Sequence, residues 1–282
     1  MKKNILNFIK ELYKIWVTER PNVLAAALAY FGMFSFAPVI YIAFTVAGLF
    51  SDNLFMVNNF LEKVEDTFGA DIAELIQSSV NNLSQIPSEE TSLLSSIIAF
   101  FALLLAASGL FFQIQYALNT LWEVPLPDKN ETTAMLKQRL FSFLMVIGVG
   151  LVLIVATLMN IILSWLDSLI PLLAEIPYLN SLSFFGLAML SFALIYKILP
   201  DTDVAWRDVW AASAVTVLLM SIGGKLLGFY LTSGNFNSAF EAAGAVAVIL
   251  ISFYIYSQIF LFGAVFTRAY AYCFGSKVGK EI

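Results

Sequence analysis

The sequence contains no histidine and a single cysteine, Cys273. Without histidine the chain cannot form a histidine-based catalytic triad, a zinc-protease helix or a histidine proton relay. One cysteine excludes a disulfide bond within the chain. The sequence also lacks a phosphate-binding loop of the type G-x-x-x-x-G-K-[ST], which argues against ATP-driven pumping by this chain alone. We therefore expect no catalytic residues, no cofactor and no metal, and we predict that the protein is not an enzyme.

Charged residues are also scarce, at 12% of the 282 residues, whereas hydrophobic residues make up 60%. A soluble domain has about 25% charged and about 45–50% apolar residues. A helix that crosses a membrane needs roughly 20 apolar residues, because only internal hydrogen bonds satisfy its backbone in lipid. The sequence predicts an all-α polytopic membrane protein with six transmembrane helices, at Val23–Phe50, Leu93–Gln113, Leu140–Ser164, Leu182–Leu199, Val209–Tyr230 and Ala243–Phe266.

The positive charges alternate between the connections of these six segments. Of the 15 Lys and Arg residues, 13 fall in the N-terminal arm, the second and fourth connections and the tail. These are Lys2, Lys3, Lys10, Lys14, Arg20, Lys129, Lys137, Arg139, Lys197, Arg207, Arg268, Lys277 and Lys280. Cytoplasmic loops carry the excess of Lys and Arg. We therefore predict that both termini are cytoplasmic and that Arg268, Arg207 and Lys197 set the orientation.

Three regions make up the predicted organisation. Residues 1–20 form a cytoplasmic amphipathic helix, in which Ile5, Ile9, Leu12 and Trp16 recur at helical spacing; it lies on the membrane surface or packs under the bundle. Residues 21–272 form one membrane domain, with Asn22 as a candidate cap of its first helix. Residues 273–282 form a cytoplasmic tail. The external segment 51–92 carries eight acidic residues and two predicted short amphipathic helices.

A few polar residues interrupt the apolar segments and need an explanation, because polar groups are costly in lipid. Gln115 and Asn119 follow Ser108 by seven and eleven residues, so the three side chains share one helix face. Amide side chains in membranes bond to neighbouring helices, and a row of them can also contact a solute. Both interpretations stay open for these three residues, and equally for Asn160 and Gln258.

Lys225 is the one cation near the outer end of a predicted helix. It lies between Gly224 and Gly228, whose spacing favours close helix approach. Its amine can extend to the outer interface, where Glu241 is a candidate partner, or it can sit in a cavity. The sequence leaves these two alternatives open.

Several motifs together resemble one family of bacterial membrane proteins. They are AAALAYF at residues 25–31, SGLF at 108–111, QYALNTLW at 115–122, YKILP at 196–200, WRD at 206–208, GKLLGFY at 224–230 and YSQIFLFGA at 256–264. Their order and spacing resemble the YihY/BrkB family. The resemblance implies a six-helix protein of the bacterial cytoplasmic membrane. Two positions depart from the family pattern: Val265 stands where the family has Glu, and Glu241 where it has Gly.

The family has been labelled a ribonuclease, a virulence factor and a transporter. The absence of histidine argues against a nuclease, and the chain has no basic, aromatic-rich surface for nucleic acid. Our first hypothesis is transport or export of a lipid-like or amphipathic solute, with membrane lipids as partners. The alternative is a membrane scaffold or envelope-integrity factor that binds an envelope protein, or a second copy of itself, through its acidic external helices.

Overall fold

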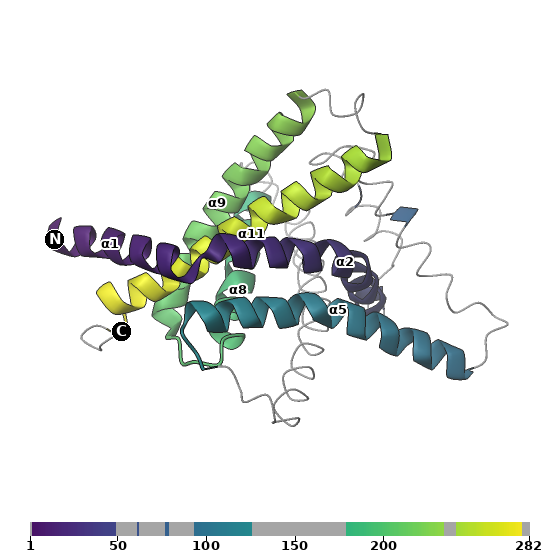
Figure 1. Cartoon of the computed structure of the whole chain (residues 1–282), viewed down its shortest axis with the longest axis horizontal. Helices are drawn as coiled ribbons and strands as arrows, with labels where there is room; N and C mark the ends of the chain where they lie inside the picture. Colours follow the sequence, from purple (N-terminus) through teal and green to yellow (C-terminus); the bar gives the residue numbers. More distant parts are fainter. Residues whose placement is uncertain are drawn as a thin grey trace, which may run out of the picture. The chain divides into compact units, whose positions relative to one another are not determined.

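The computed structural model describes residues 2–48, 61, 77–78, 93–125, 179–233 and 241–277. Its regular elements are all helices, and these residues include no strand (Figure 1). The helices are α1 (Lys2–Glu19), α2 (Pro21–Gly48), α5 (Leu93–Leu121), α8 (Leu179–Ile198), α9 (Trp206–Ser233) and α11 (Glu241–Cys273). The all-α prediction is confirmed for this part of the chain.

Two helices of the described chain are long and apolar enough to cross a membrane, over Trp206–Phe229 and Ala247–Cys273. Pro21–Ser35 and Phe185–Ile198 are shorter apolar segments. The number of membrane spans, six, therefore remains a prediction. The predicted span Leu140–Ser164, with Asn160, and nearly all of the external segment 51–92 lie outside the described residues.

Helices α5 and α11 continue beyond the ends of their predicted membrane spans. α5 passes Gln113 and ends at Leu121, as expected of a helix that runs on towards Trp122 and stops before Pro125, and α11 ends at Cys273 instead of Phe266. Each extension contains polar side chains that hydropathy assigns to a membrane boundary. In the structure Asn119 and Arg268 are 5% and 2% exposed, and each has hydrogen-bond partners, namely Asp201 for Asn119 and the Leu121 carbonyl and Glu123 for Arg268.

The chain divides into two compact units. The first contains Met1–Met33, Phe112–Met135 and Ala188–Ile282, and the second contains Phe34–Phe111 and Leu136–Leu187. Most of the described tertiary contacts between side chains belong to the first unit. The helix packing and the candidate site below are those of the first unit alone.

In the core of the first unit, α8, α9 and α11 come into close contact at Gly263. A Cβ atom added to this residue would lie 2.0 Å from Thr216 Oγ1 and 2.3 Å from Tyr196 Oη. Tyr196 is 1% exposed; its hydroxyl donates to the carbonyl oxygen of Phe260 at 2.7 Å and lies 3.1 Å from the Thr216 hydroxyl. Only glycine leaves room for this contact, so Gly263 fixes where the three helices meet.

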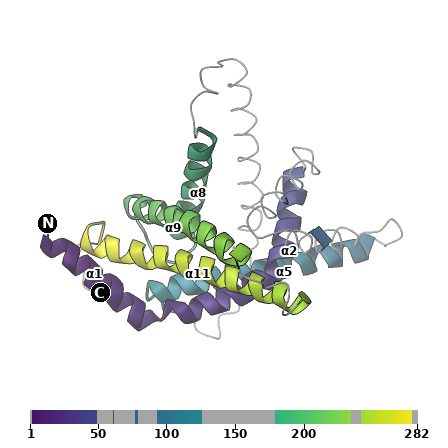
Figure 2. The same ribbon diagram turned by 90° about the horizontal axis from the view of Figure 1, so that it is seen from above.

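α1 packs against α11 through one aromatic face (Figure 2). The Phe8 ring lies 5.1 Å from that of Phe266 and 5.7 Å from that of Phe274, and Trp16 lies 6.0 Å from Phe262. Of the two interpretations of this helix, these contacts favour packing on the bundle. A second apolar stripe stays exposed on the same helix, at Leu6, Ile9, Tyr13 and Val17. That α1 lies on a membrane surface remains a prediction.

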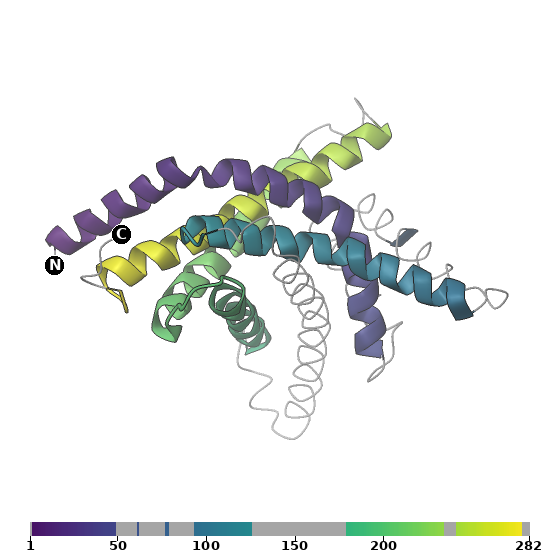
Figure 3. The same cartoon turned by 60° about the horizontal axis from the view of Figure 1, so that its bottom comes forward.

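Only Arg20 separates α1 from α2, and Figure 3 shows the short break between these two helices. Arg20 has φ of 47°, the left-handed conformation that lets one helix stop within a single residue. Pro21 then begins α2, because its fixed φ suits the first helical position and its missing N–H has no helical partner there. The predicted cap at Asn22 is wrong, since this residue lies within the first turn of α2.

Candidate functional site

The loop between α8 and α9 is fixed by two buried amides of α5. Asn119 Nδ2 donates to Asp201 Oδ2 at 2.7 Å, and its Oδ1 accepts the backbone N–H of Asp201 at 2.8 Å. Gln115 Nε2 donates to the two carboxylate oxygens of Asp201 at 3.3 and 3.2 Å. A carboxylate that accepts several N–H groups makes stronger bonds than a neutral acceptor. Both amides therefore position this loop.

Arg268 is buried where three segments of the first unit meet. Its Nη1 donates to the carbonyl oxygen of Leu121 at 2.5 Å, and its Nη2 donates to Glu123 Oε1 at 2.6 Å. Glu19, the last residue of α1, has a carboxylate oxygen 3.8 Å from Nη1. The arginine satisfies a terminal carbonyl of α5 and carries a positive charge to the negative end of that helix. It thereby connects α1, α5 and α11.

The two acids around Arg268 have opposite pKa shifts. Burial raises the pKa of Glu19 above its ordinary value of 4.5, and Arg268 only partly offsets this. The hydrogen bond from Arg268 lowers the pKa of Glu123 below 4.5. Glu123 lies just past α5 with φ of 53°, and the N–H of Val124 bonds to the carbonyl of Asn119 in a Schellman cap. The cap directs Glu123 towards the arginine.

The first turn of α9 is joined to the turn that follows α11. Asp208, in this first turn, is fully buried, and its Oδ2 accepts the backbone N–H of Ser276 at 3.2 Å and the Ser276 hydroxyl at 2.5 Å. A Cβ atom on Gly275 would lie 2.1 Å from Asp208 Oδ1. Glycine at this position lets the turn approach the carboxylate.

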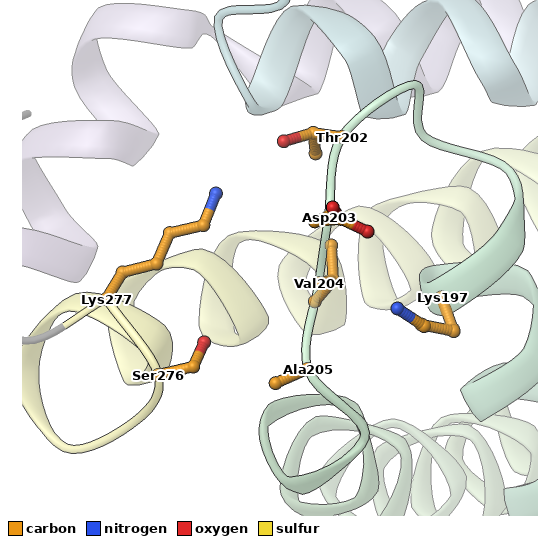
Figure 4. A pocket seen from close by; sticks show the side chains of 7 residues that line it. All are labelled: Lys197, Thr202, Asp203, Val204, Ala205, Ser276 and Lys277. Carbon is orange, nitrogen blue, oxygen red and sulfur yellow. The ribbon is translucent and has the colours of Figure 1, made fainter.

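A pocket of about 480 Å³ opens beside this turn (Figure 4). Its lining comes from the end of α8, the α8–α9 loop and the turn after α11, namely Lys197, Thr202, Asp203, Val204, Ala205, Ser276 and Lys277. Two lysines, two hydroxyls and one carboxylate share this lining with the apolar Val204 and Ala205. We call it the lysine pocket, and it is the candidate functional site.

The described residues of the sequence-predicted site have the following surroundings. Gln115 and Asn119 hold Asp201, as described above. Gln258 donates to Tyr254 Oη at 2.8 Å, one turn away on the same helix. Ser108 is fully buried in α5, and Lys225 is exposed on α9. Asn160 and the side chain of Glu241 lie outside the described residues, so the Lys225–Glu241 pair stays a prediction.

Sequence reasoning missed the lysine pocket and the role of Arg268. From the sequence, Lys197 and Arg268 are interpreted as orientation charges, because each lies at the predicted cytoplasmic end of an apolar segment, and Lys277 is assigned to the tail. One available signal was the sequence PDTD at residues 200–203, placed between Lys197 and Arg207. So many polar residues in a short connection favour a fixed loop with bound side chains.

The long apolar helices and the buried polar cluster at their ends define an α-helical membrane protein. The family model described as virulence factor BrkB matches residues 12–281, so the chain belongs to the BrkB family.

Similar proteins from three bacteria are described as UPF0761 membrane proteins. That of Alteromonas mediterranea is 26% identical, over 99% of this chain and 94% of the relative. The relative from Tolumonas auensis is 24% identical, over 90% of this chain and 82% of the relative. That of Chlorobium phaeobacteroides is 23% identical, over 97% of this chain and 58% of the relative. No solved structure matches the chain significantly. The resemblance to the BrkB family is confirmed.

Proposed function

We propose that the protein crosses the bacterial cytoplasmic membrane six times with both termini in the cytoplasm. Two features of the first unit support this topology. The Phe8 and Phe274 rings lie 5.7 Å apart, so α1 and the end of α11 lie on the same side. Lys197 of the fourth connection and Lys277 of the tail, two separate predicted cytoplasmic segments, line one pocket at this end. Lys225 lies 19 residues beyond the start of α9, roughly 28 Å along the helix. This distance is consistent with Lys225 lying near the opposite, outer side of the membrane.

Cysteine labelling tests this topology. Single cysteines at positions 63 and 137, in a background where Cys273 is replaced by Ser, should react from opposite sides of the membrane. Position 63 should react with an impermeant maleimide in spheroplasts, and position 137 only after the membrane is opened. Labelling of both positions from one side would overturn the six-span arrangement.

We propose further that the protein moves a lipid-like or amphipathic solute across the membrane and has no enzymatic activity. The observation that carries this proposal is the lysine pocket at the end of apolar helices. α9 begins at the pocket wall, and further along it exposes Leu218, Ile222, Leu226 and Phe229. A pocket lined by two lysines at one end of a helix whose exposed face is apolar further along suits a molecule with an anionic group and an apolar tail.

Reconstitution into liposomes tests the activity. Purified protein should speed the movement of fluorescently labelled phospholipid between leaflets, measured by the fraction that external dithionite quenches. Replacement of both pocket lysines by Gln should slow this movement, while the K10Q/K14Q variant, which removes the same charge from α1, should not. No acceleration over protein-free liposomes across a panel of lipids and amphipathic solutes would remove the support for transport.

A second candidate function, a membrane scaffold, is favoured by the engagement of Gln115 and Asn119. Because both amides hold Asp201, they are not available to form a row of solute contacts on α5. A scaffold would bind an envelope protein through its acidic external segment. Deleting residues 58–83 should then abolish partner capture in membrane pull-downs and leave the remaining bundle folded, as judged by thermal melting and size-exclusion chromatography.

A further inference from the structure

The lysine pocket has two walls, both held from a helix that does not line it. The loop wall is made by Thr202, Asp203, Val204 and Ala205, and the turn wall by Ser276 and Lys277. In Figure 4 the Lys277 amine extends from the turn wall towards the loop wall. None of the described lining residues belongs to α5, yet the end of this helix bonds to Asp201, beside the loop wall, and the residue that follows it contacts Lys277.

The loop wall is fixed by a two-point contact with Asn119. Its Nδ2 donates to the Asp201 carboxylate at 2.7 Å, and its Oδ1 accepts the backbone N–H of Asp201 at 2.8 Å. Leu199 and Val204, on either side of Asp201, are both 1% exposed. A contact at two points fixes the orientation of a residue as well as its position, and Asp201 directly precedes Thr202 of the lining. Asn119 therefore sets where this wall lies.

The Lys277 amine of the turn wall is placed by an aromatic ring. Its Nζ lies 4.6 Å from the ring centroid of Trp122, within the range of cation–π attraction, and 5.9 Å from that of Tyr272. Trp122 is 8% exposed, so its neighbours hold the ring in place. The backbone of the turn is held separately, because Ser276 donates to the Asp208 carboxylate. Trp122 thus acts on the amine of Lys277 and not on the turn itself.

One arginine fixes the segment from which both walls are held. Arg268 donates to the Leu121 carbonyl at 2.5 Å and to Glu123 at 2.6 Å, and these are the residues on either side of Trp122. Asn119 lies in the helical turn just before them. A displacement of this segment would therefore move both contacts together.

We propose that Asn119 and Trp122 are positioning residues of the lysine pocket, Asn119 for its loop wall and Trp122 for the Lys277 amine. They act through Asp201 and Lys277 and do not touch the solute. Walls that are already in place lower the entropy that a ligand must lose, so loosening them should weaken binding before it slows movement. The inference deepens the proposed function, on which it rests for what the pocket binds, because it names the residues that set the shape of the site.

Cysteine labelling of the purified full chain in detergent tests the loop wall without any solute. N119A should raise the rate at which a T202C/C273S protein reacts with a maleimide by about fivefold. N119D/D201N exchanges the two side-chain groups, so that a carboxylate at position 119 can accept both N–H groups of position 201, and should restore the slow rate. Q113A is the matched control, because Gln113 is a buried amide of α5 with no bond to either wall in the described part of the chain.

Lysine acetylation followed by mass spectrometry tests the turn wall. W122L should raise the rate at Lys277 by about fivefold, because leucine lacks the attraction of the indole for the ammonium group. Lys197 lines the same pocket from the end of α8 and serves as the internal control, whose rate should stay unchanged. W210L, at an exposed tryptophan of α9, controls for the loss of an indole.

The variants should differ in pattern. N119A loosens the loop wall alone and W122L the Lys277 amine alone, whereas R268K, whose single amine cannot bond on both sides of Trp122, loosens both. Equal labelling in N119A and Q113A, no rescue by N119D/D201N, or equal acetylation changes at Lys197 and Lys277 would overturn the inference. D201A, at an exposed residue, and W122F, with a weaker cation–π ring, replace N119A and W122L where thermal melting shows that a variant fails to fold.

The liposome assay with fluorescent phospholipid supplies a readout that a merely structural role would not move. N119A should raise the mole fraction of lipid that gives half-maximal movement by about fivefold and lower the maximal rate by less than about twofold. A fall in maximal rate with unchanged half-saturation would contradict a positioning role. If wild type moves no lipid but the labelling pattern holds, the transport proposal fails and the positioning of the pocket walls stands.

Discussion

Two contact points on α11 differ in chemistry although only five residues, about 7.5 Å along the helix, separate them. At Gly263 the neighbouring groups are neutral: the Tyr196 hydroxyl, the Thr216 hydroxyl and a backbone carbonyl. At Arg268 a buried guanidinium bonds to a helix-terminal carbonyl and to carboxylates. The first point uses hydrogen bonds without charge, and the second uses charge.

The two contact points differ because their surroundings can stabilise different kinds of buried group. Neutral hydroxyls need one partner each when buried, and Tyr196 finds it in a main-chain carbonyl. A buried charge needs both a counter-charge and hydrogen bonds, which only the ends of α1, α5 and α11 together supply. The change from neutral to charged contacts along α11 therefore marks where polar loops begin to replace apolar helix faces.

The largest expected effect is at Arg268. Replacing it with Ala leaves the Leu121 carbonyl and the largely buried Glu19 carboxylate without the guanidinium, which should cost about 3 kcal/mol of unfolding free energy. Thermal melting in detergent or unfolding in mixed micelles measures this loss. R207A is the control, since Arg207 is exposed on α9 and should change stability by less than about 0.5 kcal/mol. Similar stabilities for the two variants would mean that the buried arginine connects nothing.

The next effect is expected at the neutral contact. G263A places a methyl group against Thr216 and Tyr196 and should cost about 2 kcal/mol, because the helices must separate. In a Y196F/T216A background the penalty should shrink, since both clashing oxygens are gone. G186A is the control: a Cβ there has nothing within 4 Å, so it should be neutral or stabilise the helix. An equal penalty in both backgrounds would contradict the close approach at Gly263.

The contrast also explains what could be predicted from the sequence. The helices themselves follow from local patterns. The face of α1 that packs is predicted only in part, because Trp16 contacts α11 whereas Ile9 of the predicted apolar stripe is exposed. The Tyr196, Asp201 and Arg268 contacts join residues 64, 82 and 145 positions apart, and no local pattern encodes such pairings. Hydropathy also treats Arg268 as a boundary residue, because it scores the charge and not its partners. A single sequence gives the elements and leaves the polar contacts between them open.

A smaller effect is expected where α5 holds the loop. N119A removes two hydrogen bonds to Asp201 and should cost about 1 kcal/mol, because part of the loop can bond to water instead. Hydrogen exchange should quicken at residues 199–205 and stay unchanged at the Gly263 contact. A double-mutant cycle with D201N isolates the coupling between the two side chains. Additive effects in that cycle would show that the amide and the carboxylate act independently.

The smallest effects distinguish the two acids beside Arg268, and they should have opposite signs. Glu123 has a lowered pKa, so it contributes stability above pH 4.5 that is lost as the pH falls through its folded value. Glu19 has a raised pKa, so its contribution is present below pH 4.5 and is lost as the pH rises through its folded value. At pH 7, E123Q should therefore lower stability, by less than about 1 kcal/mol because the Glu123 side chain is 52% exposed. E19Q should leave stability unchanged or raise it. Melting curves of both variants between pH 4 and pH 8, about the window set by these shifts, provide the measurement. A loss at pH 7 in E19Q as large as that in E123Q would mean that Arg268 favours both carboxylates equally, and the asymmetry of the cluster would be wrong.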